Sequence, residues 1–299
     1  MTVRRVLARA VVFLASRPMG PPTPVTLQRL WFEAASSGGI LPAGTGVERL
    51  RLGGRPAERI TPAGADESRA VLLLHGGAFL IGSPRTHRVL AAHLAAAVGC
   101  PVVTLDYRRA PEHPYPAAVD DAAAAYAQLS DRVPTAVLGD SAGGALALLL
   151  ALRLRDAGAK LPPALALISP VADLTLASSD AYRAVDTVVR RSWLRRGTRA
   201  FVGSADAAAL SPLAATLKGL PPVRVQVAGR ERLRDEGVQL GERLRSAGVD
   251  VQVEVLHGLW HDAQLQAHLV PEAAAAVRDL GEWLRLRLAG VPDSRLPAS

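Results

Sequence analysis

The stretch Val137-Leu138-Gly139-Asp140-Ser141-Ala142-Gly143-Gly144 lies between a β-prone segment, residues 134–138, and a helix-prone segment rich in Ala, Leu and Arg, residues 145–155. A Gly-x-Ser-x-Gly sequence in this setting is typical of a sharp strand-to-helix turn, which strains the backbone of the serine and exposes its hydroxyl. The amides at the start of the helix would face an anion formed beside that hydroxyl. The pattern therefore predicts that Ser141 is a catalytic nucleophile, whereas the five residues alone also fit a glycine-rich turn with a capping serine.

The composition fits one large domain of the α/β class. The chain has 299 residues, of which 49% are hydrophobic, and this is ample for a large core. The net charge is +8, but the basic residues are scattered arginines without a basic tail, so we expect a solvated surface and no nucleic-acid partner. Cys100 is the only cysteine, which excludes an intrachain disulfide and a metal site built from cysteines.

The N-terminus is the one place where a membrane or targeting segment needs consideration. No run of about 18 uncharged apolar residues occurs, so we expect no membrane span. Arg4 and Arg5 precede an apolar run, as in a signal peptide, but Arg9 interrupts it and no clear cleavage site follows. We therefore expect an amphipathic helix that covers the domain, and a cytoplasmic location.

Strands and helices are predicted to alternate along the chain. The predicted strands span residues 47–52, 57–61, 69–74, 101–107, 134–138, 164–169, 223–228 and 250–256. The predicted helices span residues 2–16, 24–36, 86–98, 117–129, 145–155, 233–247 and 271–288. This alternation implies a mainly parallel sheet with helices on both faces. We expect a single domain over residues 1–299, with residues 1–40 and 171–214 as a cap and residues 292–299 as a loose tail.

A nucleophilic serine needs a base, an orienting acid and donors for the oxyanion, and in such a sheet the chain order is serine, acid, histidine. The loop after the last predicted strand holds His257 and His261, and the residues alone do not choose between them. Glu231, Asp235 and Glu236 follow the strand before it. Each of these carboxylates also fits a solvated surface position.

A second glycine-containing turn, His75-Gly76-Gly77-Ala78-Phe79, follows the predicted strand over residues 69–74. Glycines after a buried strand let backbone N–H groups turn towards an active site, as in the HGGG-type motif of esterases. A simple turn after a strand is the alternative interpretation. Together with the serine turn, the segment predicts an oxyanion hole.

Three motifs in order resemble the hormone-sensitive-lipase branch of the α/β-hydrolases, which includes bacterial esterases. Residues 75–78 resemble its HGGG element, residues 106–116 (DYRRAPEHPYP) resemble its DYRLAPEHPFP signature, and residues 139–144 match its GDSAGG element. The resemblance covers roughly residues 45–290. It implies the α/β-hydrolase fold, with a mainly parallel sheet of about eight strands flanked by helices, and a helical cap.

The resemblance also chooses among the candidate acids and bases. The segment that starts at Glu231 matches the position of the family's acid, with Glu in place of the commoner Asp, and Asp235 matches a second, structural carboxylate. The triplet Gly258-Leu259-Trp260 implies that His261 is the base and His257 a bystander.

The resemblance further implies the donors of the oxyanion hole. They are expected among the backbone amides of Gly76, Gly77, Ala78 and Ala142, and Ala78 replaces the third glycine of the family motif. Residues 106–116 and Asp173 are expected to be structural.

The expected function is a serine acyl hydrolase that cleaves short-chain carboxylic esters or acetyl groups of small molecules without a metal or cofactor. One alternative is an N-acetyl deacetylase of an antibiotic pathway, similar to the enzyme that acts on the phosphinothricin tripeptide. A second is a non-catalytic binding protein like the plant gibberellin receptors, which lack the histidine. The presence of Ser141, Glu231 and His261 favours the enzyme. A homodimer is compatible with the sequence.

A basic segment inside the expected cap bears on the charge of the substrate. If residues 188–199 are helical, Arg191, Arg195 and Arg199 share one face. Beside a pocket mouth this stripe would attract an anionic substrate. A solvated cap surface is the favoured interpretation, because long basic side chains usually face water.

Overall fold

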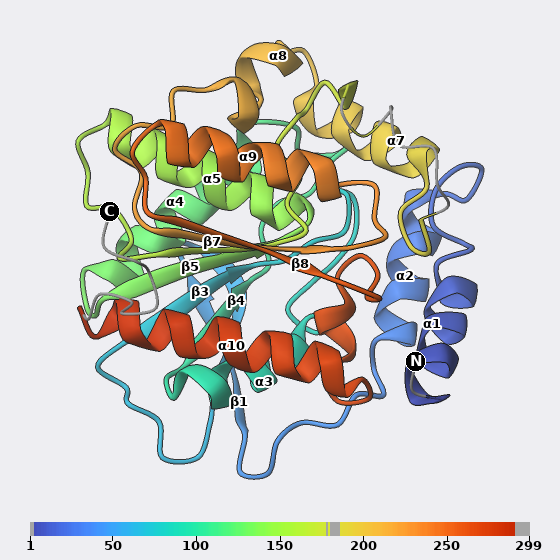
Figure 1. The fold of residues 1–299 in the computed structure, drawn as a ribbon, viewed down its shortest axis with the longest axis horizontal. Helices are drawn as coiled ribbons and strands as arrows, with labels where there is room; N and C mark the ends of the chain where they lie inside the picture. The colour runs from blue at the N-terminus through green and yellow to red at the C-terminus, as the bar shows by residue number, and fades with distance from the viewer. Residues whose placement is uncertain (1–2, 178, 180–185, 291–299) are drawn as a thin grey trace.

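An eight-stranded sheet runs through the molecule in the order β1-β2-β4-β3-β5-β6-β7-β8 (Figure 1). The computed structural model describes residues 3–177, 179 and 186–290. The β2 strand is antiparallel to both β1 and β4, and all other neighbours are parallel. The strands are β1 (Gly46–Leu52), β2 (Arg55–Thr61), β3 (Ala70–Leu74), β4 (Val102–Leu105), β5 (Thr135–Asp140), β6 (Leu165–Ile168), β7 (Val223–Ala228) and β8 (Val251–Leu256).

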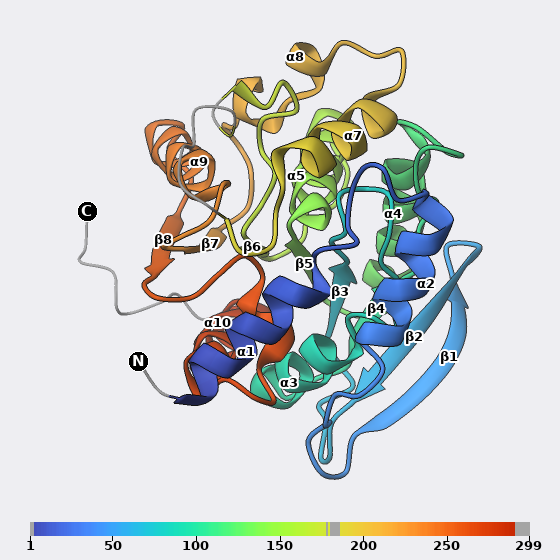
Figure 2. The ribbon, with the colours of Figure 1, turned by 90° about the vertical axis from the view of Figure 1, so that its right-hand side faces the viewer.

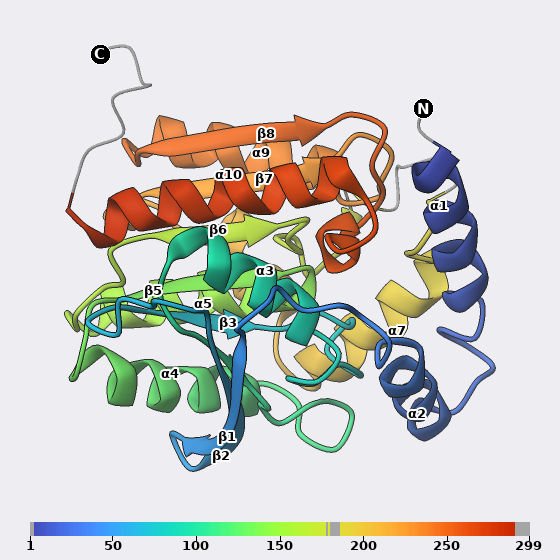
Figure 3. The ribbon, with the colours of Figure 1, turned by 90° about the horizontal axis from the view of Figure 1, so that it is seen from below.

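Helices cover both faces of the sheet. One face carries α3 (Arg88–Val98) and α10 (Pro271–Leu288), which lie in front of the sheet in Figure 3. The other carries α4 (Ala117–Ser130), α5 (Ala142–Asp156) and α9 (Arg234–Ser246). A third group gathers at one end of the sheet (Figure 2): α1 (Val3–Ala15), α2 (Val25–Ala35) and α7 (Arg191–Val202). The short helices are α8 (Ala207–Leu210), η1 (Pro212–Ala214) and η2 (Ala263–Gln266).

The central strand β3 shows why the sheet is buried on both faces. All five of its residues are buried, and their side chains alternate between the two hydrophobic clusters of the core. Leu72 and Leu74 belong to the cluster under α4 and α5, whereas Val71 and Leu73 belong to the cluster under α3 and α10. A continuous apolar run is what a parallel strand between two helical layers requires. The predicted mainly parallel sheet with helices on both faces is confirmed.

Several predicted elements are shorter in the structure, and two of them end at loops near the site. The helix predicted over residues 86–98 begins at Arg88, since the Thr86 hydroxyl donates to the Ser83 carbonyl at 2.9 Å. The strand predicted over residues 101–107 ends at Leu105. The chain then turns so that the Tyr107 hydroxyl donates to the His75 carbonyl at 2.6 Å.

The helices α1 and α2 precede the sheet in sequence but are fastened to its loops. Arg29 of α2 donates to the carbonyls of Leu80 and Ala110 at 2.8 and 3.0 Å. It also forms two hydrogen bonds with the Glu112 carboxylate, at 2.9 and 2.7 Å. The guanidinium group thus donates to four acceptor oxygens at fixed angles, so α2 is held against the loop that follows β3.

Part of the expected cap and tail cannot be compared with the structure. Residues 1–2, 178 and 180–185 of the predicted cap, and the predicted tail over 292–299, lie outside the described residues. The division into domain, cap and tail stays a prediction. None of the helices within residues 3–177 and 186–290 has the length and apolar character needed to cross a bilayer.

Candidate active site

Ser141 lies at a tight turn between β5 and α5, with backbone angles φ 52° and ψ −115°. A positive φ at a residue with a side chain is strained, and such strain is held only where the surroundings enforce it. Two glycines enforce it here. A Cβ on Gly143 would lie 1.8 Å from the Leu74 carbonyl oxygen, and one on Gly139 would lie 2.2 Å from the Gly143 oxygen. The start of α5 therefore passes close to both β5 and the end of β3 only with glycine at these two positions.

The structure brings Ser141, His261 and Glu231 into one hydrogen-bonded chain. The Ser141 Oγ lies 3.0 Å from His261 Nε2, and His261 Nδ1 lies 2.6 Å from Glu231 Oε2. The second Glu231 oxygen accepts the Ala228 N–H at 2.7 Å, which fixes the carboxylate on the end of β7. All three side chains are buried. This is the geometry in which an imidazole takes a proton from a hydroxyl while a carboxylate holds its tautomer.

The other candidates for base and acid lie elsewhere. His257 is exposed at the end of β8, and Asp235 is an exposed partner of Arg234. The prediction that Asp235 is the second, structural carboxylate is wrong. Glu236 takes that place: it is fully buried and accepts the backbone N–H groups of Ala172 and Asp173. One residue along a helix turns a side chain by about 100°, which is enough to exchange the solvent face for the core.

Burial also changes the pKa of the Glu236 carboxyl group. It raises the pKa of Glu236 to about 8, although the two amides that it accepts act in the opposite direction. A carboxyl group with such a pKa is mostly protonated at neutral pH. Glu236 therefore holds the loop after β6 as a structural group.

Of the predicted oxyanion donors, Gly76 does not fit. Its N–H donates to Asp140 Oδ2 at 3.0 Å and is therefore committed to a carboxylate. Within the described residues, the N–H groups of Gly77 and Ala78 have no hydrogen-bond acceptor. Ala142 is the first residue of α5, where the N–H has no partner within the helix. Gly77, Ala78 and Ala142 remain as candidates.

The loop that carries these donors is strained and is packed against α7. Ala78 and Phe79 have φ values of 52° and 62°. A Cβ on Gly197 of α7 would lie 2.0 Å from the Ala78 carbonyl oxygen, so the helix backbone lies directly on the loop. The Phe79 ring stacks on Phe201 of α7 with centroids 4.1 Å apart. Contacts with α7 therefore hold Ala78 in a conformation that glycine would adopt without strain.

Residues 106–116 also contact the loop of residues 75–79, as expected of a structural motif. The Tyr107 hydroxyl bonds to the His75 carbonyl, and the Tyr107 ring stacks on the His75 imidazole with centroids 4.2 Å apart. Burial lowers the pKa of His75, so this imidazole stays neutral. Asp173, the other residue expected to be structural, accepts the Thr175 N–H at 2.9 Å and the Ala177 N–H at 3.0 Å.

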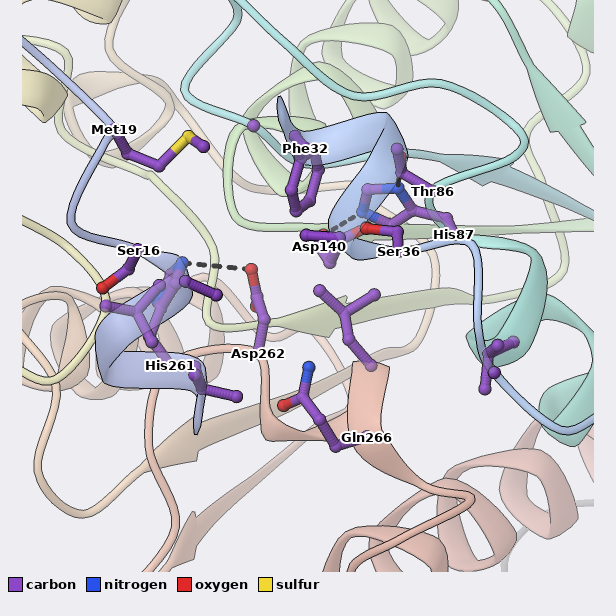
Figure 4. Close-up of a pocket in the computed structure, with 18 of the residues that line it drawn as sticks. Ser16, Met19, Phe32, Ser36, Thr86, His87, Asp140, His261, Asp262 and Gln266 are labelled. Atoms are coloured by element: carbon purple, nitrogen blue, oxygen red, sulfur yellow. Dashed lines mark hydrogen bonds and ion pairs between the residues drawn. The ribbon is translucent and has the colours of Figure 1, made fainter. Parts of the chain in front are cut away.

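A second histidine–carboxylate pair lies beside the triad. His87 Nε2 lies 3.0 Å from Asp140 Oδ2, and His87 Nδ1 lies 2.8 Å from the Thr86 hydroxyl (Figure 4). Burial opposes the charging of His87, but Asp140 outweighs burial and raises its pKa. No sequence pattern singles out His87, whereas Asp140 stands inside the Gly-Asp-Ser motif. Asp140 thus joins His87 and Gly76 to the nucleophile turn.

Asp262 is a third carboxylate at the triad, and no sequence motif marks it. It has a left-handed backbone, with φ 51°, and its Oδ2 lies 3.0 Å from His261 Nε2, the nitrogen that also faces Ser141. Burial opposes the charging of His261, but Asp262 and Glu231 outweigh burial and raise the pKa of His261 well above its ordinary value. Burial raises the pKa of Asp262 to about 6, with Asp140 and Glu231 acting in the same direction and His261 against them.

A cavity of about 350 Å³ opens beside Ser141 and His261. Its walls come from α1, α2, α7 and the segment around η2, so helices distant in sequence enclose it. Most of the wall is apolar and includes Val11, Val12, Met19, Phe32, Trp193 and Leu265. This size and character are typical of a site for a small ligand that is mostly apolar.

The arginine stripe of α7 lies apart from this cavity. Trp193, Leu194 and Gly197 form part of the buried face of the helix. Arg191, Arg195 and Arg199 line a separate open depression. In the described part of the chain, no arginine or lysine lines the cavity beside Ser141. The surface interpretation of the stripe is favoured over attraction of an anion into the site.

Comparisons with known proteins bear on the same site. A family model described as alpha/beta hydrolase fold matches residues 71–265. LipR of Mycobacterium tuberculosis, which is named as an acetyl-hydrolase, is 37% identical over 292 residues, covering 95% of this chain and 93% of that protein. An acetyl-hydrolase of Streptomyces hygroscopicus is 38% identical over 246 residues, or 79% of this chain and 81% of that one. An esterase structure from the bacterial hormone-sensitive lipase family has a TM-score of 0.89 at 35% identity, covering 96% and 99% of the two chains.

Proposed function

This chain belongs to the hormone-sensitive-lipase branch of the α/β-hydrolase family and is a carboxylic ester hydrolase, and we propose that Ser141, His261 and Glu231 are its catalytic triad. The observation that carries the proposal is the position of His261. Its two ring nitrogens lie 3.0 Å from the Ser141 hydroxyl and 2.6 Å from the Glu231 carboxylate. A hydroxyl on a strained turn, a buried imidazole and a carboxylate on its far side are the parts that acyl transfer requires.

In the proposed reaction, the Ser141 oxygen attacks the carbonyl carbon of the ester, and its proton passes to His261 Nε2. The negative charge that forms on the carbonyl oxygen is held by amides of Gly77, Ala78 and Ala142. The bond to the leaving oxygen then breaks, and that oxygen takes the proton from Nε2. Water repeats the sequence on the acyl-enzyme, which releases the acid and restores Ser141. Glu231 fixes the Nδ1 proton and stabilises the imidazolium throughout.

We propose small esters with short acyl chains as substrates, because the apolar cavity of about 350 Å³ is enclosed by helices. With p-nitrophenyl esters, kcat/KM is expected to rise from acetate to butyrate by up to roughly tenfold, since each buried methylene contributes about 0.8 kcal/mol. It should fall again for dodecanoate, because the acyl chain and the p-nitrophenyl group together exceed the volume of the cavity. Steady-state rates across the series measure this, and a profile that rises up to dodecanoate would contradict it.

The acid gives a test of the triad. Glu231→Gln is expected to lower kcat by roughly 10²–10⁴-fold with little change in KM, because an amide facing Nδ1 favours the wrong tautomer of His261. Glu231→Asp should lose part of that activity, since its shorter side chain must reach the same nitrogen. The matched control is Asp235→Asn, which neutralises an exposed carboxylate on the same segment. Normal kcat in Glu231→Gln with an inactive Asp235→Asn would assign the acid to Asp235.

We also propose a cytoplasmic location, a homodimeric state and action on small molecules without a nucleic-acid partner. The location is supported by the cysteine content. Cys100 is buried and is the only cysteine, so the chain forms none of the intrachain disulfides that are common in oxidising compartments. The dimer is supported by β8, whose outer edge lies at the end of the sheet and is only half-buried. Cell fractionation and light scattering during gel filtration test the two proposals.

A further inference from the structure

Asp262 and Ser141 compete for the same atom. Each lies 3.0 Å from His261 Nε2, and a neutral imidazole has only one lone pair or one proton to offer there. Figure 4 shows the Asp262 carboxylate directed at the His261 ring inside the cavity. To accept the Ser141 proton, His261 must be neutral with a lone pair on Nε2. That lone pair would then face the Asp262 carboxylate oxygens, and the two would repel each other. The active arrangement is therefore favoured when another group takes up the Asp262 carboxylate.

The charges around the cavity indicate what that group is. Asp140, Asp262 and Glu231 bring three carboxylates to the site, against the imidazoles of His87 and His261. His268 also lines the cavity, but burial lowers its pKa and it adds no charge. No arginine or lysine from the described elements reaches the wall. The side chain of Asp262 is nine-tenths buried, and its Oδ1 has no hydrogen-bond partner among the described residues.

We infer that Asp262 forms a subsite for a protonated amine on the alcohol side of the ester, so that the preferred substrates are acyl esters of amino alcohols. An ammonium N–H that donates to the Asp262 carboxylate neutralises the negative charge that faces the lone pair of His261. The Nε2 atom is then free to accept the proton of Ser141. The leaving oxygen must lie near Nε2 to receive its proton, so a group two carbons further along lies within reach of the neighbouring carboxylate. This inference rests on the proposed triad and adds no new bond chemistry to it.

The charge state of Asp262 supports the subsite. With a pKa of about 6, the carboxylate is mostly ionised at neutral pH, where a trialkylamine is mostly protonated. A charge-assisted hydrogen bond in a buried site is stronger than a neutral one. The cavity therefore favours a cationic ligand, although the chain as a whole carries a net charge of +8.

The test compares two esters that match in shape. Dimethylaminoethyl acetate carries N–H⁺ where isoamyl acetate carries C–H, and both release acetic acid that a pH-stat measures. At about pH 7, kcat/KM for the amine ester is expected to exceed that for isoamyl acetate by at least about tenfold in the native enzyme, as a charge-assisted hydrogen bond implies. In Asp262→Asn this ratio should fall by at least about tenfold. Asn and Gly both tolerate a left-handed backbone, so Asp262→Gly serves as a second variant.

The control is Asp235→Asn, which removes one negative charge from the protein surface and should leave the ratio unchanged. A native ratio near one, or an equal ratio in the native enzyme and both Asp262 variants, overturns the subsite. Hydrolysis of isoamyl acetate, which should be lost in Ser141→Ala, distinguishes a failure of the subsite from a failure of the proposed triad. If the native enzyme hydrolyses that ester without preferring the amine ester, only the subsite is wrong. If Ser141→Ala keeps the activity, the proposed triad is wrong and the subsite with it.

Discussion

Ser141→Ala is expected to lower kcat for p-nitrophenyl acetate by roughly 10⁴-fold or more. The substitution removes the oxygen proposed to attack the ester, while the proposed oxyanion donors, the amides of Gly77, Ala78 and Ala142, stay in place. A small residual rate should therefore remain above that of the uncatalysed reaction. A fluorophosphonate should label the native enzyme at Ser141, as peptide mapping by mass spectrometry would show, and should not label the variant.

The variant is expected to fold normally, because alanine keeps the Cβ that serine already holds at φ 52°. Equal thermal unfolding temperatures for the native protein and Ser141→Ala check this. Ser192→Ala, at an exposed serine of α7, is the matched control and should keep full activity and labelling. Covalent label on another residue, or a kcat within a few fold of native, would remove Ser141 from the mechanism.

His261→Ala is expected to reduce kcat by a comparable factor, roughly 10⁴-fold or more, because a triad acts as a unit and its members are not additive. Without the imidazole, no group within hydrogen-bond distance of the Ser141 hydroxyl can take its proton, among the contacts that the structure describes. The double variant with Ser141→Ala should be little slower than either single variant. Initial rates at saturating p-nitrophenyl acetate measure all three.

His257→Ala is the control for this experiment, since His257 is an exposed histidine four positions earlier in the same loop. It should retain most of the native kcat. The opposite pattern, an inactive His257→Ala with an active His261→Ala, would show that the loop after β8 rearranges to present the other imidazole.

The fold was accessible from the sequence because its signals are local. β3 is one apolar run, and the elbow at Ser141 is one pentapeptide between a β-prone and a helix-prone segment. Gly139 is needed because β5 passes within contact distance of the start of α5, its neighbour in the chain, whereas Gly143 is needed because α5 passes the end of β3 at Leu74, which is distant in sequence. Element boundaries were less accessible where side chains bond to a loop, as Thr86 does to Ser83.

The acid and the base were accessible only in part. The residues alone left two histidines and three carboxylates open, and the resemblance to a family chose His261 and Glu231. The same resemblance assigned Asp235 the structural role that Glu236 takes, and it placed Gly76 among the oxyanion donors. Both errors arise from the direction in which a side chain or an N–H points, which depends on elements distant in sequence.

The sequence by itself determined the sheet and the strand-to-helix turn at Ser141, because strand and helix patterns are carried by adjacent residues. Only the tertiary structure decided the charge of the cavity. Asp140, Glu231 and Asp262 are up to 122 positions apart, yet Glu231 and Asp262 both contact His261 and Asp140 contacts His87 beside it, while the arginines of α7 face another depression. Electrostatic interactions act through space and strengthen with burial, so the cavity differs from the rest of a chain with a net charge of +8: its wall holds Asp140, Asp262 and three histidines but no arginine or lysine from the described residues.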